Sequence, residues 1–197
     1  VPRLVTSSPF REFTVSFGGN SLYLTSKPSA YVEGSTFLIR PSGNTQGGVF
    51  EVVTDGKTGL VTNPGEIVHL NSMWGKNGLV TFLSNNGQTK TLSIQTIASK
   101  CVWGTNNFLV CAVPRLILRG KEGLPDDWFQ GRTTFEDDLV TVDPLSGEHF
   151  SLYSFKNEDG IFDIESLSID DENGVVSFVE KEEETLWLLN TNNFQQE

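Results

Sequence analysis

The chain has 197 residues, the length of one domain or two small ones, and its hydrophobic content of 37 % is enough for a sizeable core. Its net charge of −11 argues against nonspecific binding to DNA or RNA, which depends on Lys and Arg neutralising phosphates. No apolar run approaches the roughly 18–20 residues that span a bilayer, so we expect no transmembrane segment.

The charge is unevenly distributed along the chain. Residues 1–121 carry 11 Lys and Arg against 5 Asp and Glu, whereas residues 122–197 carry 3 against 20. Such asymmetry can mark a site for a charged partner, and it can equally reflect acidic residues in solvated loops.

The sequence predicts an all-β fold. No stretch of ten or more residues has the apolar spacing of an amphipathic helix. Short segments rich in Val, Leu, Phe and Thr instead alternate with Gly, Asn, Asp and Pro, as in strands joined by turns. The expected strands are Phe13–Phe17, Leu22–Ser26, Gly48–Val53, Leu79–Leu83, Thr89–Ile94, Phe108–Val113, Leu139–Val142, Val175–Val179 and Thr185–Leu189, with a further strand at His149–Phe155.

Four predicted hairpins repeat one pattern, in which an aromatic or apolar residue precedes a polar turn and an alternating strand. The anchor residues are Phe17, Trp74, Trp103 and Ile169. This pattern resembles the WD-like repeats of TolB-type β-propellers, and the best match is Ser168–Gly174 with the strands that follow it.

The resemblance implies a β-propeller-like array of antiparallel blades, within a single all-β domain over residues 1–197. The repeats cover about 13–56, 68–96, 99–155 and 164–191. The 29-residue step from Trp74 to Trp103 is too short for four strands, so we expect that blade to lack one. Because the chain begins with Val1 and four blades is a small ring, we expect the C-terminal part of a larger propeller. A partner chain or a missing N-terminal segment would then complete the ring.

The two cysteines, Cys101 and Cys111, lie on the two arms of one predicted hairpin. A three-residue loop would place them face to face for a disulfide, and a four-residue loop would place them on opposite faces. A disulfide would fit an extracytoplasmic or secreted protein, whereas two buried thiols would also be compatible with a cytoplasmic protein. His69 and His149 are not at zinc-ligand spacing, and we expect neither a metal nor a cofactor.

The most distinctive segment is a predicted insertion over residues 114–138. It holds adjacent acids and aromatics that favour partner recognition, and the candidate binding residues are Asp126, Asp127, Trp128, Phe129, Gln130 and Arg132. Alternatively, Trp128 folds back to plug the blade while the Asp pair caps a short turn. Two other acidic stretches, 170–174 and 180–184, are interpreted as turns.

These observations favour a noncatalytic propeller scaffold that binds a protein or a cell-envelope component through its loops. One alternative is a hydrolase of glycans or peptides, which requires acids such as Asp127, Asp138 and Asp170 to converge within roughly 5–10 Å. Another alternative is a partial propeller completed by a second chain in an assembly.

Overall fold

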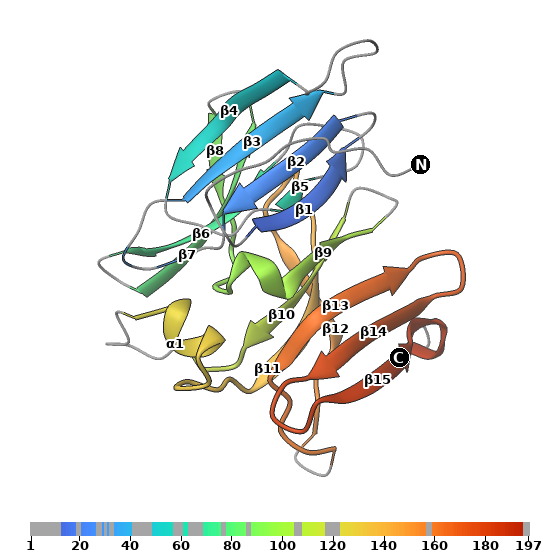
Figure 1. Ribbon diagram of the computed structural model, residues 1–197. Helices are drawn as coiled ribbons and strands as arrows, with labels where there is room; N and C mark the ends of the chain where they lie inside the picture. The colour runs from blue at the N-terminus through green and yellow to red at the C-terminus, as the bar shows by residue number, and fades with distance from the viewer. Residues whose placement is uncertain are drawn as a thin grey trace, which may run out of the picture.

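The structure is a computed structural model in which every strand pairing is antiparallel (Figure 1). In the described part of the chain the strands form four separate sheets and the longest helix has four residues, so the all-β prediction is confirmed. Among the described residues, no helix has the length and apolar character needed to cross a membrane. The structure describes residues 13–18, 21–26, 29, 31, 34–40, 49–56, 61–62, 69–75, 78–85, 88–104, 108–116, 123–156 and 159–194.

The first and second sheets come from the N-terminal half of the chain, and each is a meander of four strands in chain order. The first sheet contains β1 (Phe13–Gly18), β2 (Ser21–Ser26), β3 (Gly34–Arg40) and β4 (Val49–Gly56). The second sheet contains β5 (Val61–Thr62), β6 (His69–Gly75), β7 (Gly78–Asn85) and β8 (Gln88–Thr91).

The third and fourth sheets come from the C-terminal half. The third sheet contains β9 (Cys101–Trp103), β10 (Leu109–Pro114), β11 (Asp137–Val142) and β12 (His149–Tyr153). Among the residues that the structure describes, the fourth has three strands, β13 (Ile164–Asp170), β14 (Val175–Glu180) and β15 (Thr185–Asn190). Three short helices complete the described structure: η1 (Ala98–Lys100), α1 (Asp126–Phe129) and η2 (Thr191–Phe194).

The first strands of successive sheets contact one another. β1 contacts β5, β5 contacts β9, and β9 contacts β13. The remaining strands of each sheet follow outward in chain order, so four meanders are arranged in series from β1 to β15 (Figure 1).

The prediction that the second repeat lacks a strand is wrong, because the second sheet has four strands and the fourth sheet has three. The error comes from Trp74, which lies on the second strand of its sheet, whereas Phe17, Trp103 and Ile169 lie on first strands. First strands begin at residues 13, 61, 101 and 164, so the first two steps fall within about 40–50 residues. The side chains of Phe17 and Trp74 lie outside the described ones.

The predicted strand Thr89–Ile94 is too long, since β8 ends at Thr91. Leu92 and Ile94 do alternate with polar residues, and both are buried. Beyond β8, however, the backbone is held by other bonds: Leu92 N donates to Thr81 O at 2.9 Å, and Ser93 N donates to Gly147 O at 3.2 Å. Buried residues therefore alternate with polar ones in this segment although it is not a strand.

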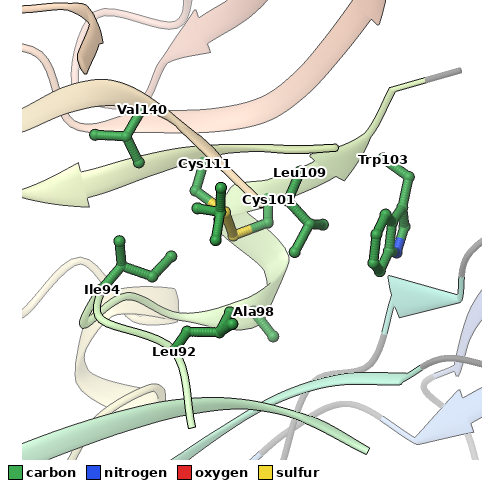
Figure 2. Close-up of a cluster of buried hydrophobic side chains, with 9 residues drawn as sticks. Leu92, Ile94, Ala98, Cys101, Trp103, Leu109, Cys111 and Val140 are labelled. Atoms are coloured by element: carbon green, nitrogen blue, oxygen red, sulfur yellow. A yellow bond between two sulfur atoms is a disulfide. The ribbon is translucent and has the colours of Figure 1, made fainter. Parts of the chain in front are cut away.

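A disulfide joins Cys101 and Cys111, so the pairing alternative is confirmed (Figure 2). The register places Cys101 directly opposite Cys111 on β9 and β10, as a three-residue loop requires. Both half-cystines are buried in a cluster of the third sheet with Leu92, Ile94, Ala98, Trp103, Leu109, Val140 and Val142.

A second cluster packs the fourth sheet against the third. Val176 and Phe178 of β14 contact a group that includes Ala112, Leu139 and Phe155. Phe178 meets the rings of Phe155 and Phe162 edge to face, at centroid distances of 5.8 and 5.9 Å. This aromatic packing fixes the position of the loop before β13, which forms part of the site described next.

Candidate functional site

Two adjoining hollows lie where three segments meet: the loop 159–163, the turn 181–184 between β14 and β15, and the segment 134–136 before β11. Their cavity volumes are about 290 and 420 Å³. Both are lined by Ile161, Glu180 and Glu182, and we call the two together the acidic groove. The described lining includes no Lys or Arg, and its acids are Glu136, Asp159, Asp163, Glu180, Glu182 and Glu183.

The turn 181–184 is built by a buried carboxylate. Glu180 is buried at the end of β14, and its side chain accepts the backbone N–H of Glu182 at 3.0 Å and of Glu183 at 2.6 Å. These bonds satisfy Glu180 within the protein. The side chains of Glu182 and Glu183 remain exposed at the groove.

Trp187 presents an aromatic surface beside these acids. Its ring is 42 % exposed and packs at right angles on Phe162, with ring centroids 5.0 Å apart. The indole N–H donates to Thr185 Oγ1 at 2.9 Å, which fixes the ring orientation. Ile161 on the facing loop is 67 % exposed. The groove therefore combines carboxylates with the apolar surface of a fixed aromatic ring, a composition suited to binding a partner.

A buried ion cluster lies behind the groove. Lys100 is fully buried at the end of η1, and its ammonium is 2.6 Å from Asp137 Oδ2 and 2.7 Å from Asp163 Oδ1. Trp128 of α1 donates its indole N–H to both Asp163 oxygens, at 2.8 and 2.9 Å. Asp163 also lines the smaller hollow. The cluster thus ties η1, α1, β11 and the loop before β13 together.

Lys181, in the turn 181–184, also contacts this cluster. Its ammonium lies 4.1 Å from the centre of the Trp128 ring and donates to the Trp128 backbone carbonyl. Burial lowers the pKa of Lys181, while Asp163 opposes that shift. Two cations therefore contact the Trp128 ring, because Lys100 is 4.8 Å from its centre.

Stability should rise as the pH falls through the titration of Asp137. Burial raises the pKa of its carboxyl to about 6 even though Lys100 and the Ile164 amide oppose the shift. Below about pH 6 the folded state binds a proton at Asp137, whereas the unfolded chain binds this proton only below about pH 4. Between pH 7 and pH 5 the wild type should gain about 1 kcal/mol relative to Asp137→Asn.

Urea unfolding of both proteins at these two pH values measures the gain. Because the two chains share every other titrating group, the difference between their pH profiles isolates position 137. Parallel profiles for the two proteins would contradict the assigned titration.

The six residues predicted to bind a partner lie on and around α1. Trp128 is buried, as in the alternative in which it plugs the blade, and Phe129 packs beside it with ring centroids 5.2 Å apart. Asp127 pairs with Arg132 at 2.8 Å, and Asp126 is half-buried. Gln130 and Arg132 are exposed. Partner binding by this segment stays a prediction that rests on the exposed residues. Residues 117–122 of the predicted insertion lie outside the described residues.

The acids required by the hydrolase alternative each have a separate partner. Asp127 pairs with Arg132, and Asp138 receives two bonds from Arg115 at 2.8 and 3.0 Å. Asp170 accepts the side-chain amide of Asn173 at 2.7 Å. β13 starts beside Asp137, and Asp170 lies at its far end, about 20 Å away at the usual strand rise. The geometry does not bring these three acids together.

His149 contacts Ser93, with its Nδ1 2.8 Å from the hydroxyl oxygen. The Ser93 hydroxyl itself donates to Gly147 O at 2.9 Å. With its proton directed at a carbonyl, the serine is not activated by the imidazole. In the described part of the chain, no group of three or more His, Cys, Asp or Glu side chains is arranged for a metal ion.

The groove was not predicted from the sequence. The acidic run 180–184 was interpreted as a solvated turn, and no pattern pointed to the loop 159–163. One signal was available in the sequence. The predicted strand 185–189 has apolar residues on both of its faces, whereas a half-exposed strand alternates apolar and polar residues.

Comparison with known proteins gives no relative from which a role can be transferred. No family model matches the chain, and no curated protein matches it.

Proposed function

We propose that this protein is a noncatalytic binding scaffold whose acidic groove takes a basic, partly apolar segment of a protein partner. One observation carries the proposal: the acids of the groove lie beside the exposed ring of Trp187, whose orientation is fixed by a hydrogen bond. A lysine or arginine side chain fits such a site, because its alkyl stem packs on apolar surface while its charge meets carboxylates.

The proposal includes a β-propeller-type architecture. Four antiparallel meanders in series, whose first strands contact one another in order, support it. In such an array the loops and turns between strands carry the binding surfaces, and the groove is formed by one loop and one turn. In the described part of the chain, the fourth sheet has no fourth strand, so β15 is its edge strand. A partner chain that completes a partial propeller remains the second candidate.

We place this scaffold outside the cytoplasm. The Cys101–Cys111 disulfide is compatible with an oxidising compartment, where such bonds persist.

Selection from a random peptide library displayed on phage tests the groove. We expect enriched peptides to combine Lys or Arg with apolar residues. Binding of an enriched peptide should weaken at least about tenfold in the double variant Glu182→Lys/Glu183→Lys, because the attraction becomes repulsion. The affinity should also fall with rising salt.

The matched control is Glu148→Lys/Glu172→Lys, which makes the same change in net charge at two exposed acids outside the groove lining. This control should change the affinity by less than about twofold. Equal weakening in both double variants would mean that only net charge matters. That result, or a failure to enrich basic peptides, would overturn the proposal.

A further inference from the structure

β15 is an unprotected strand edge. The first three sheets have four strands each, whereas the fourth ends at β15, so nothing described pairs with its outer side. Natural edge strands usually carry charges, proline or a bulge that prevents pairing with another chain. The six residues of β15, Thr185–Asn190, include no charge and no proline, and they pair with β14 in continuous register. The segment therefore has the features of a strand that accepts another strand.

Both faces of β15 are apolar. Trp187 lies opposite Phe178 and Leu189 opposite Val176, so these two side chains are on the face that packs toward the third sheet. Leu186 and Leu188 are on the other face, and each is 70 % exposed. A strand added at this edge would cover apolar surface on both faces of the sheet.

Charge identifies the occupant. The turn 181–184 at the start of β15 exposes three glutamates, and Glu182 and Glu183 with Asp159 line the groove beside Trp187. A second copy would bring the same acids and a net charge of −11, so pairing between copies is opposed by repulsion. A basic segment meets no such opposition.

We infer that β15 accepts an extended basic segment of a protein partner as the fourth strand of its sheet. Alternate side chains of an added strand point to opposite faces. One set then enters the acidic groove beside Trp187, where Lys or Arg is favoured, and the other set covers Leu186 and Leu188. Main-chain hydrogen bonds supply affinity, and the two side-chain sets supply specificity. This inference rests on the proposed function, since it specifies how the partner occupies the same groove.

Backbone methylation of a peptide tests strand addition. The probe is the blocked heptapeptide Lys-Val-Lys-Val-Lys-Val-Lys, whose lysines share one face when it is extended. Two derivatives carry N-methyl groups on the lysines or on the valines. In an antiparallel pair only one of these sets of N–H groups faces the partner strand. One derivative should therefore lose at least about tenfold in affinity, because several hydrogen bonds vanish, while the other should stay within about threefold of the parent.

Protein variants complete the test. Leu186→Ser/Leu188→Ser changes two exposed side chains, so folding is preserved, and we expect affinity for the parent peptide to fall at least about fivefold. Val15→Ser/Leu145→Ser, at two exposed apolar residues elsewhere, should leave the affinity unchanged.

The outcomes separate the inference from the proposed function. If the parent peptide binds and Glu182→Lys/Glu183→Lys weakens it, but both methylated derivatives bind equally, the groove stands and strand addition is overturned. If no basic peptide binds, the proposed function fails and the inference fails with it. A wild-type dimer in sedimentation that Leu186→Ser/Leu188→Ser abolishes would assign the edge to a second copy and overturn the inference.

Discussion

Replacing Lys100 with methionine should lower the free energy of unfolding by about 3–5 kcal/mol, the largest effect that we expect from a single substitution. Lys100 is fully buried and is within 2.7 Å of both Asp137 and Asp163. Methionine keeps the volume and removes the charge, so two buried carboxylates lose the lysine with which they form ion pairs. Urea unfolding at pH 7 measures the loss.

Two further variants separate the missing charge from the changed side chain. Lys156→Met removes an exposed lysine, and stability should change by less than about 0.5 kcal/mol. Adding Asp137→Asn and Asp163→Asn to Lys100→Met removes the uncompensated charges and should restore part of the lost stability. A loss below about 1 kcal/mol for Lys100→Met would show that the cluster does not stabilise the fold.

Removing the disulfide with Cys101→Ala and Cys111→Ala should destabilise the protein by about 2–4 kcal/mol. The bond closes a loop with a sequence separation of 10 residues and so restricts the unfolded chain. Its sulfur atoms also fill space in a buried apolar cluster (Figure 2). The two alanines should leave a small cavity there. Urea unfolding compares the variant with the oxidised wild type.

The reduced wild type is the control for the cavity. It keeps both sulfur atoms and loses only the covalent link, so its stability should lie between those of the oxidised protein and the alanine variant. Unfolding of all three proteins at one common midpoint would show that the bond contributes nothing.

The sequence predicted the features that depend on local patterns. Alternation of apolar residues predicted most strands, and the hairpin spacing brought Cys101 and Cys111 into one of two registers. Alternation also predicts that adjacent acids on a strand diverge, and Asp137 and Asp138 do so: one pairs with buried Lys100 and the other with Arg115. The strand β3 was missed because Phe37, Leu38 and Ile39 are consecutive and all buried, so the strand does not show the alternation of a half-exposed strand.

The ion cluster and the groove could not be predicted, because their members are distant in the sequence. Lys100, Asp137 and Asp163 come from η1, β11 and the loop before β13, and only the packing of the third and fourth sheets brings them together. The anchor pattern likewise could not separate first strands from second strands. Trp74 precedes a polar turn like the other anchors, although it lies on β6.

The serial order of the four sheets gives the molecule an electric polarity. Residues 13–91, which span the first two sheets, carry 5 Lys and Arg against 4 Asp and Glu, whereas residues 101–190, which span the last two, carry 6 against 19. Successive sheets lie beside one another, so this division along the sequence becomes a separation in space (Figure 1). A cationic protein that diffuses nearby experiences a torque that turns the β15 end toward it before any contact forms.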